Sequence, residues 1–195
     1  MLKMKVYLMA LVMLFLLAGV AKAIPFQADK EFSSVSLYDV SWGTASLNAD
    51  LATGFNEEVN NLDTGESYSF DFIEFYASGW GRGDFTINAT LAFSKPDNFK
   101  GDYTGGGWFW TVGGIVSGGK LTWNNPVQQF TVDGNLVEVA LSQGFAVAIG
   151  CPATATVSAT VTNRGSVPVP EPATLLLLGI GMLGLFGISR KRLNK

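Results

Sequence analysis

The sequence predicts an all-β domain, an antiparallel β-sandwich of the jelly-roll kind, between an N-terminal signal peptide and a C-terminal transmembrane helix. Three observations lead to this prediction. Short runs alternate between apolar and polar side chains, and clusters of glycine, asparagine and proline separate these runs. No segment between residues 24 and 169 has the period of an amphipathic helix. Many short strands at such spacing are typical of β-sandwiches, and a β-barrel is the main alternative.

The first 23 residues have the three parts of a secretory signal peptide. Two early lysines supply a positive start, residues 6–20 form an apolar run, and Ala21 and Ala23 provide small side chains for signal peptidase. The apolar run is short for a membrane span, which disfavours the alternative of an anchor that is never removed. We expect signal peptidase to cleave after Ala23.

The most regular alternation predicts two strands and a bulge. Residues 68–75 begin with an aromatic side chain at every second position, and the pattern then shifts by one residue at Ile73. A β-bulge inserts one extra residue and produces such a shift. Residues 85–93 alternate without a shift, and the glycine-rich residues 78–84 between the two runs predict a hairpin. We interpret Arg82-Gly83-Asp84, inside that segment, as part of the turn.

Further candidate strands follow in order along the chain, with turn-forming residues between them. They cover residues 108–116, 120–123, 127–132, 136–141, 145–149 and 154–162. Together with the earlier strands they place one extracytoplasmic β domain at residues 24–166, which is long enough to bury a real core.

The charge of this part of the chain excludes two kinds of partner. Fifteen acidic residues stand against six basic ones between residues 24 and 169, a net charge of about −9. Nucleic acids and anionic membrane surfaces both require a basic protein surface. We therefore expect no nucleic acid partner.

The residue types argue against most catalytic chemistry. The chain has no histidine, which excludes Ser-His-Asp and Cys-His catalysis and removes the commonest metal ligand. Cys151 is the single cysteine, so we interpret it as a buried small residue, with an intermolecular disulfide or free thiol as alternatives. Carboxylates are plentiful, so a paired-acid glycosidase stays open as an alternative. Asp71 and Glu74 lie in the same predicted strand. Asp71 is predicted to face solvent, which disfavours a catalytic role for it.

No cofactor or metal site is expected. The loop Asp97–Asp102 carries several oxygen-rich side chains, but their spacing does not match the EF-hand pattern. We interpret these residues as hydrated turn residues. We assign no catalytic residue and expect the protein not to be an enzyme.

Two tryptophans form the one candidate ligand site. Trp108 and Trp110 lie two positions apart, so they share one face of the predicted strand. An exposed indole offers a flat apolar surface and an N–H donor, which suits the stacking of a sugar ring. Burial in the core is the interpretation we favour for this pair, and a glycan-binding platform is the alternative.

The C-terminal segment has three parts. Pro170, Glu171 and Pro172 form a rigid, extended tripeptide. The apolar residues 173–188 follow and would span about 24 Å as a helix, less than the roughly 30 Å of a hydrocarbon core. Arg190, Lys191 and Arg192 then form a basic tail, which is typical of the cytoplasmic end of a span.

This combination resembles the PEP-CTERM sorting signal of Gram-negative bacteria. The resemblance covers residues 167–195: the motif at 170–172, a membrane helix at 173–189 and a basic tail at 190–195. It implies recognition and processing by the membrane enzyme exosortase. It also implies an exported protein in a bacterium that makes exopolysaccharide.

These features together predict a non-enzymatic exported protein of the cell surface or the exopolysaccharide (biofilm) matrix. The inner membrane would first hold the protein with its β domain in the periplasm, and processing would then release it to the surface or the matrix. The expected partners are signal peptidase, exosortase, the inner membrane and exopolysaccharide. A glycan-binding, lectin-like β-sandwich is the alternative function, and an acid-pair glycoside hydrolase is the weaker one.

Overall fold

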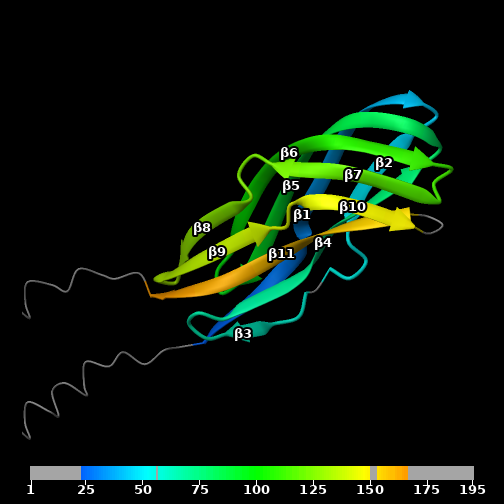
Figure 1. Ribbon diagram of the computed structural model, residues 1–195. Coiled ribbons are helices and arrows are strands. Elements are labelled where there is room, and N and C mark those ends of the chain that lie inside the picture. Colours follow the sequence, from blue (N-terminus) through cyan, green and yellow to red (C-terminus); the bar gives the residue numbers. More distant parts are fainter. Residues whose placement is uncertain (1–22, 56, 150–152, 167–195) are drawn as a thin grey trace, which may run out of the picture. The chain divides into compact units, whose positions relative to one another are not determined.

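The computed structural model describes residues 23–55, 57–149 and 153–166, which form eleven β-strands and no helix (Figure 1). None of these residues belongs to a helix that is long and apolar enough to cross a membrane. The predicted signal peptide up to residue 22, Cys151 and the predicted sorting segment at 167–195 lie outside the described residues.

The strands form two antiparallel sheets. Their bounds are β1 Ile24–Gly43, β2 Ser46–Leu51, β3 Asn60–Leu62, β4 Ser67–Ser78, β5 Trp80–Lys95, β6 Phe99–Val112, β7 Val116–Trp123, β8 Val127–Val132, β9 Asn135–Leu141, β10 Gly144–Ile149 and β11 Ala153–Ser166. The first sheet has the order β10-β7-β6-β5-β1-β3, and the second has the order β2-β4-β11-β9-β8. The prediction of an all-β antiparallel fold is confirmed.

The two sheets pack their apolar faces against each other. Phe75 of β4 contacts Phe85 of β5 with ring centroids 5.9 Å apart, and Phe99 of β6 contacts Phe130 of β8 at 5.2 Å. Each of these pairs joins one sheet to the other. Alternate residues along the strands enter this core and their neighbours face outward, as the period of two requires.

One polar side chain crosses the core between the sheets. Tyr103 of β6 is 1 % exposed, and its hydroxyl donates a hydrogen bond to the carbonyl of Val139 on β9 at 3.4 Å. Burial raises the pKa of the Tyr103 phenol well above its usual range. The hydroxyl therefore stays protonated and available as a donor.

The predicted bulge lies where the alternation shifts. Val157 of β11 pairs with Ile73 and the next residue, Ser158, pairs with Asp71, so Phe72 has no partner in the register. Both Phe72 and Ile73 are completely buried. The bulge lets two consecutive apolar residues enter the core.

The predicted hairpin between residues 68–75 and 85–93 is wrong. β4 belongs to the second sheet and β5 to the first, so the chain changes sheets at Gly79. A Cβ at Gly79 would lie 1.9 Å from the carbonyl oxygen of Thr44, which makes this close crossing possible only for glycine. Arg82-Gly83-Asp84 is therefore part of β5 and not part of a turn.

The later candidate strands correspond to β6 through β11, with shifts of a few residues at their ends. The prediction missed β1, β2 and β3, and it missed the first half of β6. Asp102, predicted to lie in a loop, is on β6 and accepts a hydrogen bond from Thr90 Oγ1 at 2.7 Å. Asp97 lies outside the strands, so the expected loop is divided between a turn and a strand.

Asn163 ties the end of β11 to the turn between β3 and β4. Its Nδ2 donates to the Leu62 carbonyl at 3.0 Å, and its Oδ1 accepts from the Gly165 amide at 2.9 Å. Its backbone carbonyl accepts from Gly65, and its backbone amide donates to Glu66. The side chain is completely buried, so its two hydrogen bonds are shielded from water.

The same turn also holds the beginning of the domain. Ile24, the first residue of β1, pairs with Leu62 on β3 and is 3 % exposed. Leu62 therefore bonds to the first strand through its pairing and to the last strand through Asn163. The start of β1 and the end of β11 lie at the same end of the sandwich, which we call the proximal end (Figure 1).

Replacing Asn163 by alanine should destabilise the domain by about 2–4 kcal/mol. The substitution leaves the Leu62 carbonyl and the Gly165 amide buried without partners, and each such group costs about 1–3 kcal/mol. The measurement is urea unfolding of the purified protein. Asn88→Ala, at an exposed site on β5, is the control and should change stability by less than about 0.5 kcal/mol. Equal stability of the two variants would contradict this role of Asn163.

Candidate functional site: an aromatic face on the first sheet

Aromatic side chains gather on the outer face of the first sheet, at the end opposite to the proximal end. Trp42 on β1 pairs with Arg82 on β5, and Arg82 pairs with Trp110 on β6. Directly paired residues of neighbouring strands point to the same face, so these three side chains form one row across three strands.

Two neighbouring rows extend the same face. One row contains Val40, Asp84 and Trp108, and it continues to Lys120 on β7. The other row pairs Trp80 with Val112 at the far end of the sheet. We call the set Tyr38, Trp42, Trp80, Trp108 and Trp110 the aromatic face.

The aromatic face is exposed. Trp42 is 53 % exposed, Trp80 64 % and Trp108 42 %, and Trp110 is half-buried. Exposed aromatic side chains that gather on one face make this face a candidate binding surface. The predicted shared face of Trp108 and Trp110 is confirmed, but the favoured interpretation of the pair as core residues is wrong. Phe109, between them, is the residue that enters the core.

Charged side chains lie among the rings. The Arg82 guanidinium lies 5.9 Å from the centre of the Trp42 ring, within reach of a cation–π interaction. Asp84 is exposed between Val40 and Trp108. The face therefore combines flat apolar surfaces with a hydrogen-bond donor and an acceptor in adjacent rows, a combination that suits a sugar ring.

Glycine on β7 determines how Trp110 lies. Gly118 pairs with Trp110, and a Cβ at this position would lie 2.8 Å from the indole Nε1 and 2.9 Å from Cε2. Any side chain at residue 118 would occupy the place of the indole ring. The absence of a side chain thus lets Trp110 lie across β7 and present its other side outward.

The carboxylates proposed for acid-pair catalysis are engaged in local hydrogen bonds. Glu74 Oε2 accepts from Tyr76 at 2.8 Å and from the backbone and side chain of Thr53 at 3.4 Å and 3.3 Å. The hydrogen bond from Tyr76 to Glu74 and the negative charge of Glu74 raise the pKa of the Tyr76 phenol. Asp71 is exposed, as predicted, and accepts from Ser158 at 3.3 Å. Within the described ranges no three acidic or cysteine side chains are grouped to hold a metal ion.

Gly118→Ala should displace the Trp110 indole without unfolding the sheet. The new methyl group would overlap the ring, and the ring is the movable partner, so the indole should tilt toward solvent and its emission should shift to the red. Fluorescence of wild-type and variant protein measures this. Gly54→Ala is the matched control, since its nearest neighbour atom would be 3.7 Å away. An unchanged spectrum for Gly118→Ala would contradict the described contact.

Comparison with known proteins identifies one segment of the chain. A family model for the PEP-CTERM protein-sorting motif matches residues 168–192. The matched range contains Pro170, Glu171 and Pro172 as well as the basic residues Arg190, Lys191 and Arg192. No curated protein and no solved structure matches the chain. The resemblance predicted from the sequence is confirmed: this chain carries a PEP-CTERM sorting signal, which indicates an exported protein that is processed by an exosortase.

Proposed function

We propose that the protein is a non-enzymatic component of the cell surface or the exopolysaccharide matrix and that its aromatic face binds polysaccharide. The PEP-CTERM match at residues 168–192 supports export and processing. The segment that we interpret as a signal peptide, residues 1–23, provides the matching entry into the export pathway. The acidic β domain is suited to an environment outside the cytoplasm.

The observation that carries the binding proposal is the row Trp42, Arg82 and Trp110 on three adjacent strands. Neighbouring strands are about 4.8 Å apart, so the two indoles lie on the order of 10 Å from each other across the sheet. A sugar chain that crosses the strands could stack on both rings, with Arg82 between them as a hydrogen-bond donor. This extends the predicted platform of Trp108 and Trp110 to a second and third strand.

The position of the aromatic face also favours this function. The chain enters the domain at Ile24 and leaves β11 at Gly165, both at the proximal end, whereas Trp42 and Trp80 lie at the other end of the first sheet. The aromatic face therefore lies at the end of the sandwich opposite to the point where the chain leaves β11. Ligand could then bind before and after processing.

Binding should depend on the rings of the central row. Addition of the host's exopolysaccharide should quench the tryptophan fluorescence of the exported protein, and Trp110→Ala or Trp42→Ala should weaken binding at least about tenfold, or about 1.4 kcal/mol. Phe32→Ala is the control, because Phe32 is 72 % exposed and lies on a bulge of β1 outside the aromatic face. Retention of full affinity by both tryptophan variants would exclude this face as the binding site.

Processing should remove the segment that follows the PEP motif. Mass spectrometry of protein from the outer or secreted fraction should show chains that begin at Ile24 and end within the matched residues 168–192. Glu171→Ala removes the charge between the two prolines and should cause the unprocessed chain to accumulate in the membrane fraction. Recovery of the intact C-terminus in all secreted molecules would refute processing, whereas the binding proposal would be unaffected.

A further inference from the structure

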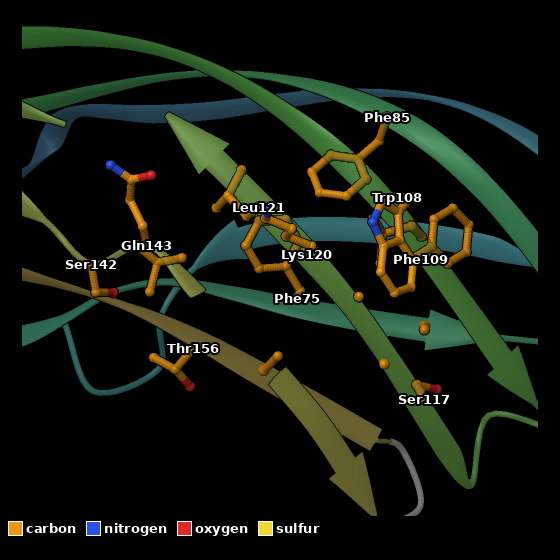
Figure 2. A pocket seen from close by; sticks show the side chains of 16 residues that line it. Phe75, Phe85, Trp108, Phe109, Ser117, Lys120, Leu121, Ser142, Gln143 and Thr156 are labelled. Carbon is orange, nitrogen blue, oxygen red and sulfur yellow. The ribbon is translucent and has the colours of Figure 1, made fainter. Parts of the chain in front are cut away.

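We propose that a cavity between the two sheets is a binding site for a small, mainly apolar molecule with one uncharged polar end, such as a medium-chain alcohol or ester. The cavity has a volume of about 280 Å³ and is drawn in Figure 2. It lies on the inner side of β7, opposite β4 and β11. Trp108 of the aromatic face also lines this cavity, whereas Trp42 and Trp110 do not, and the proposed ligand site does not depend on polysaccharide binding.

The cavity is partly open to solvent, and its volume is that of a small-ligand site. Native cores contain few voids larger than a water molecule, and an engineered apolar cavity of about 150 Å³ already binds benzene. Ordinary ligand pockets begin at about 300 Å³. A cavity of about 280 Å³ therefore has the size of a small-ligand site and exceeds a packing defect.

Small residues create the space. Ser117 and Gly119 occupy inward-facing positions on β7, and Ala77 and Ala155 occupy the facing positions on β4 and β11. Four short side chains at one place remove the atoms that would otherwise fill the gap between the sheets.

Three phenylalanine rings form the apolar wall, and Trp108 also lines the cavity. Phe75 and Phe85 contact each other at 5.9 Å, and Phe85 contacts Phe109 at 6.5 Å in an edge-to-face arrangement. All three rings line the cavity, and Leu47 and Leu121 complete the wall. Since the rings are held by one another and by the core, the wall is formed before a ligand arrives, which lowers the entropic cost of binding.

Polar groups line the cavity on another side. Ser142 is fixed there, since its Oγ accepts from the amide of Ser158 at 3.0 Å and its carbonyl accepts from Trp123 Nε1 at 3.2 Å. Gln143 follows directly and is exposed, and its side chain has no hydrogen-bond partner among the described residues. Figure 2 shows the Gln143 amide beside Ser142 and away from the aromatic rings. It can donate to or accept from a polar end group.

The lining determines the chemical class of the ligand. Apart from the exposed Lys120, no ionisable side chain lines the cavity. Burial of an unpaired carboxylate among phenylalanine rings would be costly, whereas an alkyl chain gains about 0.8 kcal/mol for each buried methylene. An uncharged amphiphile places its chain against the rings and its polar end near Gln143.

The test uses N-phenyl-1-naphthylamine, a neutral fluorescent apolar probe, with the full exported protein. We expect its emission to rise with one site per chain and 1-decanol to displace it. Ala155→Leu, which fills the cavity, should lower probe affinity at least tenfold. Thr154→Leu adds the same side chain at the neighbouring, exposed position on the other face of β11 and should retain full affinity.

Two further measurements make the result decisive. The thermal midpoint of Ala155→Leu should equal or exceed that of the wild type, because filling an empty cavity does not unfold the domain. Trp42→Ala should keep its probe affinity, which separates the cavity from the aromatic face. Failure of decanol to displace the probe, or tenfold weaker binding in Trp42→Ala, would overturn the proposal. Tighter binding of decanoate than of decanol would overturn the proposal that the polar end of the ligand is uncharged.

Discussion

Asn163 holds together the two ends of the domain, and this contact determines where the chain enters and leaves the sandwich. Its buried side chain bonds to Leu62 and Gly165, while Leu62 also pairs with Ile24 at the start of β1. Both ends of the domain are thereby confined to the proximal end of the sandwich. The far end of the first sheet is left without a connection to the termini and carries the aromatic face.

Two neighbouring glycines of β7 act on opposite sides of the same sheet. Gly118 leaves room on the outer side for the indole of Trp110, and Gly119 leaves room on the inner side for the cavity. Because consecutive residues of a strand point to opposite faces, one glycine pair provides space for both sites. The two candidate sites thus share β7, and Trp108 of the aromatic face also lines the cavity.

The sequence allowed local structure to be predicted better than long-range pairing. The shift at Ile73 correctly located the bulge, since that signal lies within one strand, and the PEP-CTERM segment was recognisable from adjacent residues. The change of sheet at Gly79 was missed because it depends on the approach of Thr44, a residue far away in the chain. Long strands such as β1 were missed because bulges and polar residues interrupt their alternation.

The candidate site illustrates the same limit. Spacing alone placed Trp108 and Trp110 on one face, but Phe109 makes the opposite face equally apolar, so the pattern could not identify which side is the core. Trp42 and Trp80 join the site only through the registers of β1, β5 and β6. The sequence also gave no sign that Ser117, Ala77 and Ala155 leave room for a cavity, because the cavity depends on how the two sheets pack against each other.

The start of β1 and the end of β11 lie at the same end of the sandwich, and this arrangement has a mechanical consequence. Under the proposed function, a load between the end of β11 and a polymer on Trp42 and Trp110 would run along the length of the strands. The hydrogen bonds between antiparallel strands lie perpendicular to that direction, so many of them resist the load together in shear. Tension passes from the first sheet to the second through the packed core and the crossings at Thr44 and Gly79. With the proposed polysaccharide binding, the domain would carry force between a surface and a polymer.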